Sequence, residues 1–308
     1  MNLKKFILPA LLFSSLNIFA QISTPDYVPA NGLVGWWPFN GNANDNSGKG
    51  NNGAVTSAAL SVDRFGNPNA AYLFNGADSR IDVADAASLR CRKLTLSAWV
   101  KTKDTLKTYQ VIYKGSMYAD GEAYALTVDE GGEPYSAAKF GSNCATAIGW
   151  LGPGKGTAID TGSWTHVVST YDGTTTKIYK NGVLENSSTI TGLIDSCIGG
   201  GLRFGFDHLR WSVSTGDPFN GYIDDIGIWN RALDETEISH LYSGTADCGN
   251  GKMGVNVCDP QRSLHVKDVL RLEPRDTAPD NPGKGDIYFD GTLNKLRVYD
   301  GTVWQNCW

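Results

Sequence analysis

The segment from Trp164 to Thr189 constrains the fold more than any other part of the chain. It holds three stretches in which apolar and polar residues alternate, separated by Asp172-Gly173 and Asn181-Gly182. A period of two is typical of a half-buried β-strand. Asp-Gly and Asn-Gly favour tight hairpin turns, because both residues of each pair tolerate a positive φ. The segment therefore predicts an antiparallel meander of three strands.

The same pattern recurs before and after this meander. Leu94–Val100 alternates apolar residues with small or polar ones, and the chain contains 36 glycines that suit short turns. Further strands are expected at 33–39, 71–74, 79–83, 109–114, 123–129, 136–140, 202–206 and 219–229. One short helix follows, because Asp234 and Glu237 form a capping-box pattern and Gly244 can end the helix.

The N-terminal segment predicts export from the cell. Residues 1–20 combine Lys4 and Lys5 with a short apolar run and a small residue, Ala20, at the end, which is the pattern of a signal peptide. The run is too short for a transmembrane helix, and no later segment is apolar enough to cross a bilayer. A formal net charge of −5 argues against nucleic acid as a partner. Secretion to the extracellular space or the cell surface is expected.

The chain is expected to contain two folded parts after a lead-in at 21–29. The first is an all-β domain over 30–245, and a linker at 246–254 follows it. The second, 255–308, predicts a small β meander in which Asp-Gly-Thr occurs at two turns. This unit has few apolar positions and therefore only a thin core. We expect it to dock onto another chain or to form a homo-oligomer.

Several motifs resemble LamG-like (laminin G type 3) domains of the concanavalin A-like lectin/glucanase group. They are 32–41, 44–48, 71–76, 96–100, 164–168, 179–182 and 219–233. The resemblance covers roughly 30–245 and implies a two-sheet antiparallel jelly-roll sandwich. It also implies that Trp99, Trp164, Trp229 and His166 are structural. The tail, 259–304, resembles the ends of bacterial and phage fibre-type surface proteins.

A structural calcium ion is the cofactor that the sequence favours. The loop 40–53 offers Asp45, several asparagines and many backbone carbonyls, which are the oxygen ligands that calcium prefers. The resemblance implies a second ligand in the final strand, which matches Asp224, with Asp225 as the alternative. Asx turns made by Asp45 and the asparagines are the competing interpretation.

Carbohydrate binding is the expected function, because sugars stack on exposed aromatic side chains beside polar groups. Tyr135, Trp150 and Trp211 lie outside the recognisable core motifs and are the predicted ligand-binding residues. A structural role in surface assembly is the alternative. A glycan-active hydrolase is less favoured, since no catalytic pair of carboxylates is recognisable on a strand, and we expect no enzyme activity.

Six cysteines in an exported chain favour disulfides. The spacing does not fix their pairing. We expect Cys144 to pair with Cys197 and Cys248 with Cys258, which leaves Cys91 and Cys307 unassigned. The sequence thus predicts a secreted adhesion or binding module that recognises a glycan.

Overall fold

The computed structural model describes residues 24–115, 122–141, 149–150, 154–197, 199–207, 217–244, 253–255, 264–266, 272, 274–279 and 282–307. The chain forms two compact units, Met1–Ser243 and Gly244–Trp308. The predicted signal peptide and residues 21–23 lie outside the described residues. No helix in the described ranges is long and apolar enough to cross a membrane.

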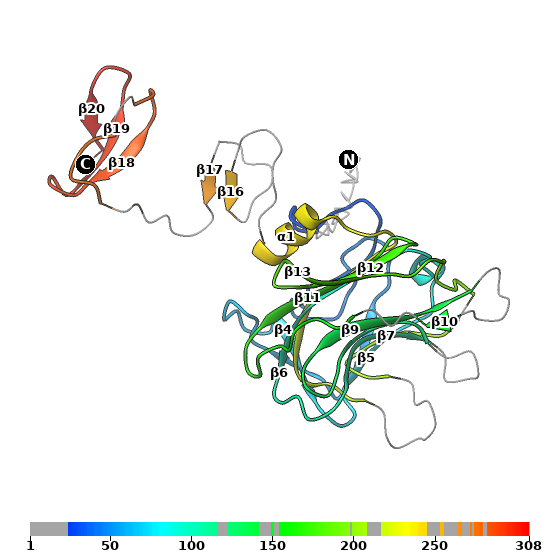
Figure 1. The fold of residues 1–308 in the computed structure, drawn as a ribbon. Coiled ribbons are helices and arrows are strands. Elements are labelled where there is room, and N and C mark those ends of the chain that lie inside the picture. The colour runs from blue at the N-terminus through cyan, green and yellow to red at the C-terminus, as the bar shows by residue number, and fades with distance from the viewer. Residues whose placement is uncertain are drawn as a thin grey trace, which may run out of the picture. The chain divides into compact units, whose positions relative to one another are not determined.

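The first unit is a sandwich of two antiparallel sheets (Figure 1). One sheet has eight strands in the order β13-β12-β11-β6-β15-β4-β3, with β1 paired to β15. Its strands are β1 (Leu33–Trp37), β3 (Ala59–Ser61), β4 (Ala71–Asn75), β6 (Leu94–Thr102), β11 (Thr165–Tyr171), β12 (Thr175–Lys180), β13 (Val183–Thr189) and β15 (Asn220–Trp229).

The other sheet has seven strands in the order β10-β9-β8-β7-β14-β5-β2. Its strands are β2 (Gly53–Thr56), β5 (Arg80–Val83), β7 (Tyr109–Gly115), β8 (Glu122–Val128), β9 (Pro134–Phe140), β10 (Gly149–Trp150) and β14 (Leu202–Phe204). A short 3-10 helix, η1 (Ala87–Leu89), lies in the connection from β5 to β6.

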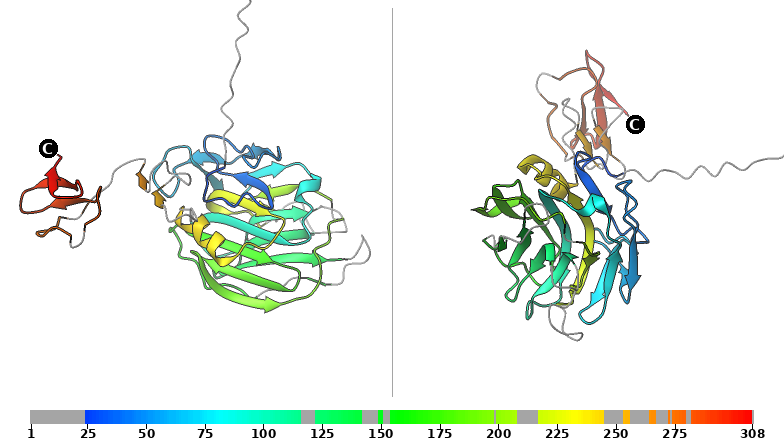
Figure 2. Two further views of the ribbon diagram at one scale, coloured as in Figure 1. Left: turned by 90° about the horizontal axis from the view of Figure 1, so that it is seen from above. Right: turned by 90° about the vertical axis from the view of Figure 1, so that its right-hand side faces the viewer.

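The main hydrophobic core draws on strands of both sheets, which face each other in two layers (Figure 2). Trp37 is the last residue of β1 and Phe39 lies two residues further on, and both side chains are fully buried. Their rings meet Phe204 of β14 edge-on, with centroid distances of 4.8 and 6.2 Å. Aromatic contacts of this kind tie the two sheets together beyond the area that they bury.

The outer face of the eight-stranded sheet carries a second apolar cluster, which explains why the helix docks there. Ile238 and Leu241 of α1 (Glu235–Ser243) share this cluster with Val168, Tyr179 and other side chains. The predicted capping box is present, because Asp234 Oδ1 accepts from Glu237 N at 2.9 Å and Glu237 Oε2 accepts from Asp234 N at 3.0 Å.

The sequence predictions for the first unit agree well with the observed strands. The predicted meander is β11, β12 and β13, joined at the two expected turns, with Val167 facing Lys180 and Thr175 facing Thr189. The jelly-roll sandwich is confirmed. The edge strands β2 and β3 were not predicted, because their short sequences are rich in small residues and only partly buried.

The second unit contains two small sheets, and the predicted C-terminal β meander is one of them. The strands β18 (Ile287–Asp290), β19 (Lys295–Tyr299) and β20 (Trp304–Asn306) form a three-stranded antiparallel sheet, and β16 (Met253–Val255) pairs with β17 (Leu264–Val266).

Both Asp-Gly-Thr turns of the second unit use their aspartate in the same way. Asp290 Oδ1 accepts from Thr292 N and Leu293 N, and Asp300 Oδ1 accepts from Thr302 N and Val303 N. Tyr288 is the only buried hydrophobic side chain among the residues of this unit that the structure describes. Oligomerisation through this unit stays a prediction.

Candidate functional site

The three predicted glycan-binding aromatics are only partly described. Tyr135 lies on β9 and is half-buried, on the face of the strand that also carries Ala137 and Lys139. Trp150 belongs to β10, where its backbone pairs with Lys139, but its side chain lies outside the described residues. Trp211 lies outside them altogether. The predicted role of these three residues stays a prediction.

The cysteines divide into two groups. Cys91 is a buried free thiol, and Cys307 is an exposed one. Burial raises the pKa of the Cys91 thiol to about 12. Cys197 is disulfide-bonded, whereas Cys144, Cys248 and Cys258 lie outside the described residues, so the two predicted pairings stay predictions.

The loop between β1 and β2, in which calcium was expected, is organised by the side chain of Asp45. Its Oδ1 accepts hydrogen bonds from Trp36 N at 3.0 Å and Ser47 N at 2.8 Å. Its Oδ2 accepts from Asn51 N at 2.9 Å. A carboxylate that binds three backbone N–H groups stabilises a loop that has few apolar side chains.

Replacing Asp45 with alanine is expected to lower the free energy of unfolding by about 1–3 kcal/mol, because three backbone donors lose their acceptor. Urea denaturation measures the change, and the exposed Asp160→Ala is the matched control, expected to change it by less than about 0.5 kcal/mol. Equal effects of the two substitutions would contradict this role.

Melting curves with and without a chelator, run on the same samples, test the predicted calcium ion.

Asp224, the other predicted calcium ligand, lies in a different environment. The Arg64 guanidinium is 3.2 Å from Asp224 Oδ2 and 2.8 Å from Asp225 Oδ2, and all three side chains are largely buried. A β-bulge between Asp224 and Gly227 gives Asp225 a φ of 45°, so that consecutive carboxylates reach one arginine. The described residues contain no group of three or more His, Cys, Asp or Glu side chains suited to a metal ion.

The loop between β3 and β4 positions Arg64. Asp63 accepts from Phe65 N and Asn67 N, each at 2.8 Å, and this turn directs the next side chain into the bulge. The Arg64 guanidinium carbon also lies 4.4 Å from the centroid of the Trp99 ring, a cation–π distance. We call Arg64, Asp224 and Asp225 the buried ion cluster.

Burial and mutual repulsion change the protonation of the buried ion cluster. Desolvation, then the neighbouring Asp225 carboxylate, raise the pKa of Asp224, and desolvation also raises the pKa of Asp225. The single positive charge of Arg64 therefore faces two carboxyl groups whose raised pKa favours the protonated form. The two aspartates are only 2% and 9% exposed, so the cluster is closed to a substrate. The predicted role of Asp224 as a calcium ligand stays a prediction.

His166 has the structural role that the resemblance implied. Its ring stacks on Trp99 at a centroid distance of 5.1 Å, and its Nε2 lies 2.9 Å from Ser97 Oγ. Burial, with the nearby Arg64 charge, lowers the pKa of His166 to about 3. The imidazole is therefore neutral and enclosed, which makes it unsuitable as an acid or a base for a substrate.

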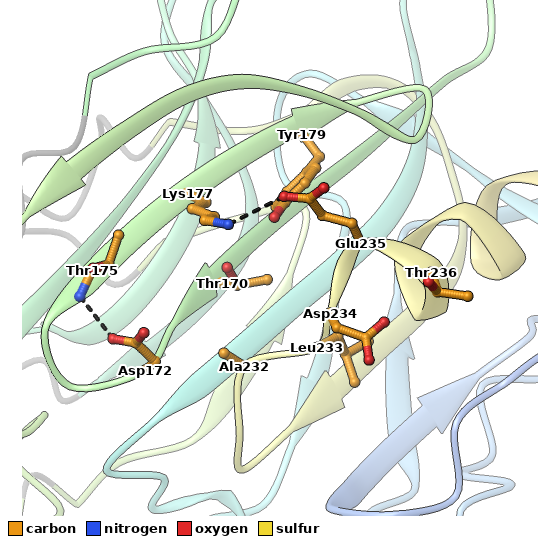
Figure 3. A pocket seen from close by; sticks show the side chains of 10 residues that line it. All are labelled: Thr170, Asp172, Thr175, Lys177, Tyr179, Ala232, Leu233, Asp234, Glu235 and Thr236. Atoms are coloured by element: carbon orange, nitrogen blue, oxygen red, sulfur yellow. Dashed lines mark hydrogen bonds and ion pairs between the residues drawn. The ribbon is translucent and has the colours of Figure 1, made fainter.

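An open groove lies between the outer face of the eight-stranded sheet and the start of α1 (Figure 3). Its volume is about 510 Å³, and we call it the helix groove. Thr175, Lys177 and Tyr179 line it from β12, because every second residue of a strand points to the same face. The lining is completed by Thr170 of β11, which pairs with Lys177, by Asp172 and by residues 232–236.

The helix groove presents polar groups of several kinds. Lys177 Nζ donates to Glu235 Oε1 at 3.2 Å, which raises the pKa of Lys177. Burial alone would raise the pKa of Asp172, but the backbone N–H groups of Thr174 and Thr175 bind its carboxylate and hold the pKa below its ordinary value. In this part of the described chain, no hydrogen bond engages the hydroxyls of Thr170 and Thr175.

The helix groove was not predicted from the sequence, although half of its lining residues lie in the meander that was identified first. The signal was the polar half of the alternation in β12, at Thr175 and Lys177. From the sequence, Thr175 and Lys177 are expected to face solvent. They line a groove only because α1 docks beside them.

Residues 75–239 match the laminin G type 3 family model, described as the concanavalin A-like lectin/glucanases superfamily, over more than half of the chain. The chain belongs to the laminin G type 3 family. The resemblance expected from the sequence is thereby confirmed. A search of the curated proteins finds no match to this laminin G type 3 chain.

Solved structures with the same fold include two carbohydrate-active proteins. Domain 4 of AbnA, an extracellular arabinanase from Geobacillus stearothermophilus in complex with arabinotriose, has a TM-score of 0.51 and 23% identity, over 68% of this chain and 98% of that domain. A mutant of Trypanosoma rangeli sialidase displaying trans-sialidase activity has a TM-score of 0.50 and 18% identity, over 70% of this chain and 33% of the sialidase. These likenesses show a shared fold.

Proposed function

We propose that the first unit is a carbohydrate-binding module and that the helix groove holds a neutral oligosaccharide. The observation that carries the proposal is the groove itself, an open space of about 510 Å³ in which hydroxyl, ammonium and carboxylate groups converge. Sugar hydroxyls both donate and accept hydrogen bonds, so a lining that offers both kinds of group suits them. The volume is within the range of small-ligand pockets.

Binding is favoured over hydrolysis by the state of the carboxylates. Asp224 and Asp225 are adjacent acids that share Arg64, and this ion pairing together with their burial removes them from any substrate. In the helix groove, Asp172 is held by turn amides and Glu235 by Lys177. Hydrolysis needs one carboxyl that protonates the leaving group and a second that acts as nucleophile or base.

The family and the fold support the same proposal. The superfamily includes lectins, and domain 4 of the arabinanase was solved with arabinotriose. The predicted signal peptide would place such a module outside the cell, where polysaccharides and glycoconjugates are abundant. Adhesion to a glycan surface is the role that we propose for the whole chain.

A glycan array with the mature protein selects a ligand, with arabinotriose as an additional probe. Calorimetry then compares the wild type with the double variant Thr170→Val/Lys177→Met. We expect the affinity for the neutral ligand to fall at least about tenfold, or about 1.4 kcal/mol, because a hydroxyl and an ammonium donor are lost.

The control for this comparison is Lys103→Met, which removes an exposed lysine just beyond the end of β6. It is expected to leave the affinity unchanged. The proposal is wrong if the double variant is folded and binds the neutral ligand as tightly as the wild type.

A further inference from the structure

A second open groove lies at the end of the sandwich where β1 begins and β15 ends. Its volume is about 880 Å³. Lys49, Arg90, Arg92 and Lys93 line it, and none of its lining residues in the described part of the chain is acidic. We call it the cationic groove. Such a concentration of positive charge is notable in a chain whose formal net charge is −5.

The connection from β5 to β6 supplies three of these cations, two of them through alternation with buried residues. Leu89 and Cys91 are buried in the main core, so Arg90 and Arg92 between and after them point outward. The backbone of the segment is fixed, because Ile194 N donates to Arg92 O at 3.1 Å. Arg92 and its neighbour Lys93 are therefore held on a stable support.

Hydrogen bonds of Asn51 place the fourth cation, Lys49, against this segment. Asn51 Nδ2 donates to Val34 O at 2.8 Å and to Ser88 Oγ at 3.2 Å. These bonds join the β1–β2 loop to β1 and to η1. The loop in which calcium was expected thus carries one wall of the cationic groove.

The positive charge of the groove is only partly balanced. Arg90 shares the single carboxylate of Asp85 with the buried Lys114, whose Nζ is 2.8 Å from Asp85 Oδ1. No ion pair engages Lys49, Arg92 or Lys93 within the described ranges.

The surroundings of Lys93 and Arg92 show that the positive charge of both side chains stays available to a ligand. Lys93 lies close enough to Asp172 to lower the pKa of that carboxyl, but Asp172 is already bound by its own turn. The Nε of Arg92 is buried and has no hydrogen-bond partner among the described residues. The guanidinium of Arg92, which lines the groove, therefore has no anionic partner among the described residues, and an oxyanion bound in the groove would balance its charge.

We propose that the cationic groove binds an acidic oligosaccharide through carboxylate or sulfate groups. Arginine favours these planar or tetrahedral oxyanions, because its N–H groups form paired, charge-assisted hydrogen bonds. The choice of a saccharide rests on the proposed function of the unit, whereas the choice of an anion rests on the groove alone. No residue lines both grooves, although Lys93 of the cationic groove lies near Asp172 of the helix groove, and we assign a separate ligand class to each.

The test measures binding of trigalacturonate, of a dextran sulfate oligosaccharide and of unsulfated dextran to the mature protein by calorimetry. We expect both acidic probes, or one of them, to bind at least tenfold more tightly than dextran. This affinity should fall as salt rises from about 50 to 300 mM, since screening weakens exposed charge interactions. The two acidic probes distinguish carboxylate from sulfate as the recognised group.

The decisive variant is Lys49→Gln/Arg92→Gln/Lys93→Gln, for which we expect a loss of at least tenfold in affinity for the acidic probe. Lys103→Gln is the matched control, because Lys93 and Lys103 flank opposite ends of β6 and both are exposed. If the triple variant is unstable, Lys49→Gln/Lys93→Gln replaces it, as both of these side chains are exposed.

The proposal is overturned if neither acidic probe binds more tightly than dextran, or if the folded variant keeps the affinity of the wild type. An equal loss in Lys103→Gln would also overturn it, since the attraction would then be unspecific. Binding of the neutral ligand should be unaffected by Lys49→Gln/Arg92→Gln, which keeps Lys93 beside Asp172 of the helix groove. Failure of this proposal is therefore distinguishable from failure of the proposed neutral-ligand site in the helix groove, because Thr170→Val/Lys177→Met tests that site separately.

Discussion

Replacing Arg64 with methionine is expected to lower the free energy of unfolding by about 3–5 kcal/mol. The substitution leaves two carboxylates in the buried ion cluster without their only cation, and an uncompensated buried charge is strongly destabilising. The contact of the guanidinium with the Trp99 ring is lost as well. Denaturant unfolding followed by tryptophan fluorescence measures the change.

Arg80→Met is the matched control for this experiment. Arg80 Nε lies 3.0 Å from Asp82 Oδ2, but both side chains are about one-third exposed. An exposed pair of this kind contributes less than about 1 kcal/mol. If Arg64→Met is no more destabilising than Arg80→Met, the buried ion cluster does not stabilise the fold as we describe.

The same cluster predicts how stability depends on pH. Because the folded-state pKa of Asp224 is raised above the unfolded value, the folded state holds the proton more tightly. The associated stability is present below the ordinary pKa of about 3.9 and is lost as the pH rises through the higher folded-state value. We expect the wild type to lose stability relative to Asp224→Asn as the pH is raised from about 5 to 9.

The neutral asparagine mimics the protonated carboxyl, so it should be tolerated at neutral pH and should flatten this dependence. In the double variant Asp224→Asn/Asp225→Asn, Arg64 loses its remaining anion as well, and we expect a loss of about 3–5 kcal/mol at neutral pH. Asparagine accepts the positive φ of position 225, so the backbone is not the cause. Parallel pH profiles of the wild type and Asp224→Asn would refute the raised pKa.

Local sequence signals were sufficient for most of the sandwich. The turns at Asp172-Gly173 and Asn181-Gly182 and the capping box of α1 are each set by residues close together in the sequence. The resemblance extended these signals to the complete jelly roll. The edge strands β2 and β3 escaped prediction, because they are short, rich in small residues and only partly buried.

The candidate sites were harder to predict, because they depend on contacts between distant segments. Asp45 was identified as important, but the sequence could not show that its oxygens are used by three backbone amides. Asp224 was identified from the resemblance, whereas its partner Arg64 is 160 residues away in the chain. Both grooves form where segments from several parts of the sequence meet.

The most direct test of the central claim is a crystal structure of the protein with the neutral oligosaccharide that the glycan array selects. We predict that the sugar lies in the helix groove, with hydroxyls within hydrogen-bonding distance of Thr170, Lys177 and Glu235. A sugar bound on the outer face of the seven-stranded sheet, beside Tyr135, would contradict the assignment of the site. A protein that binds no glycan on the array would contradict the proposed function itself.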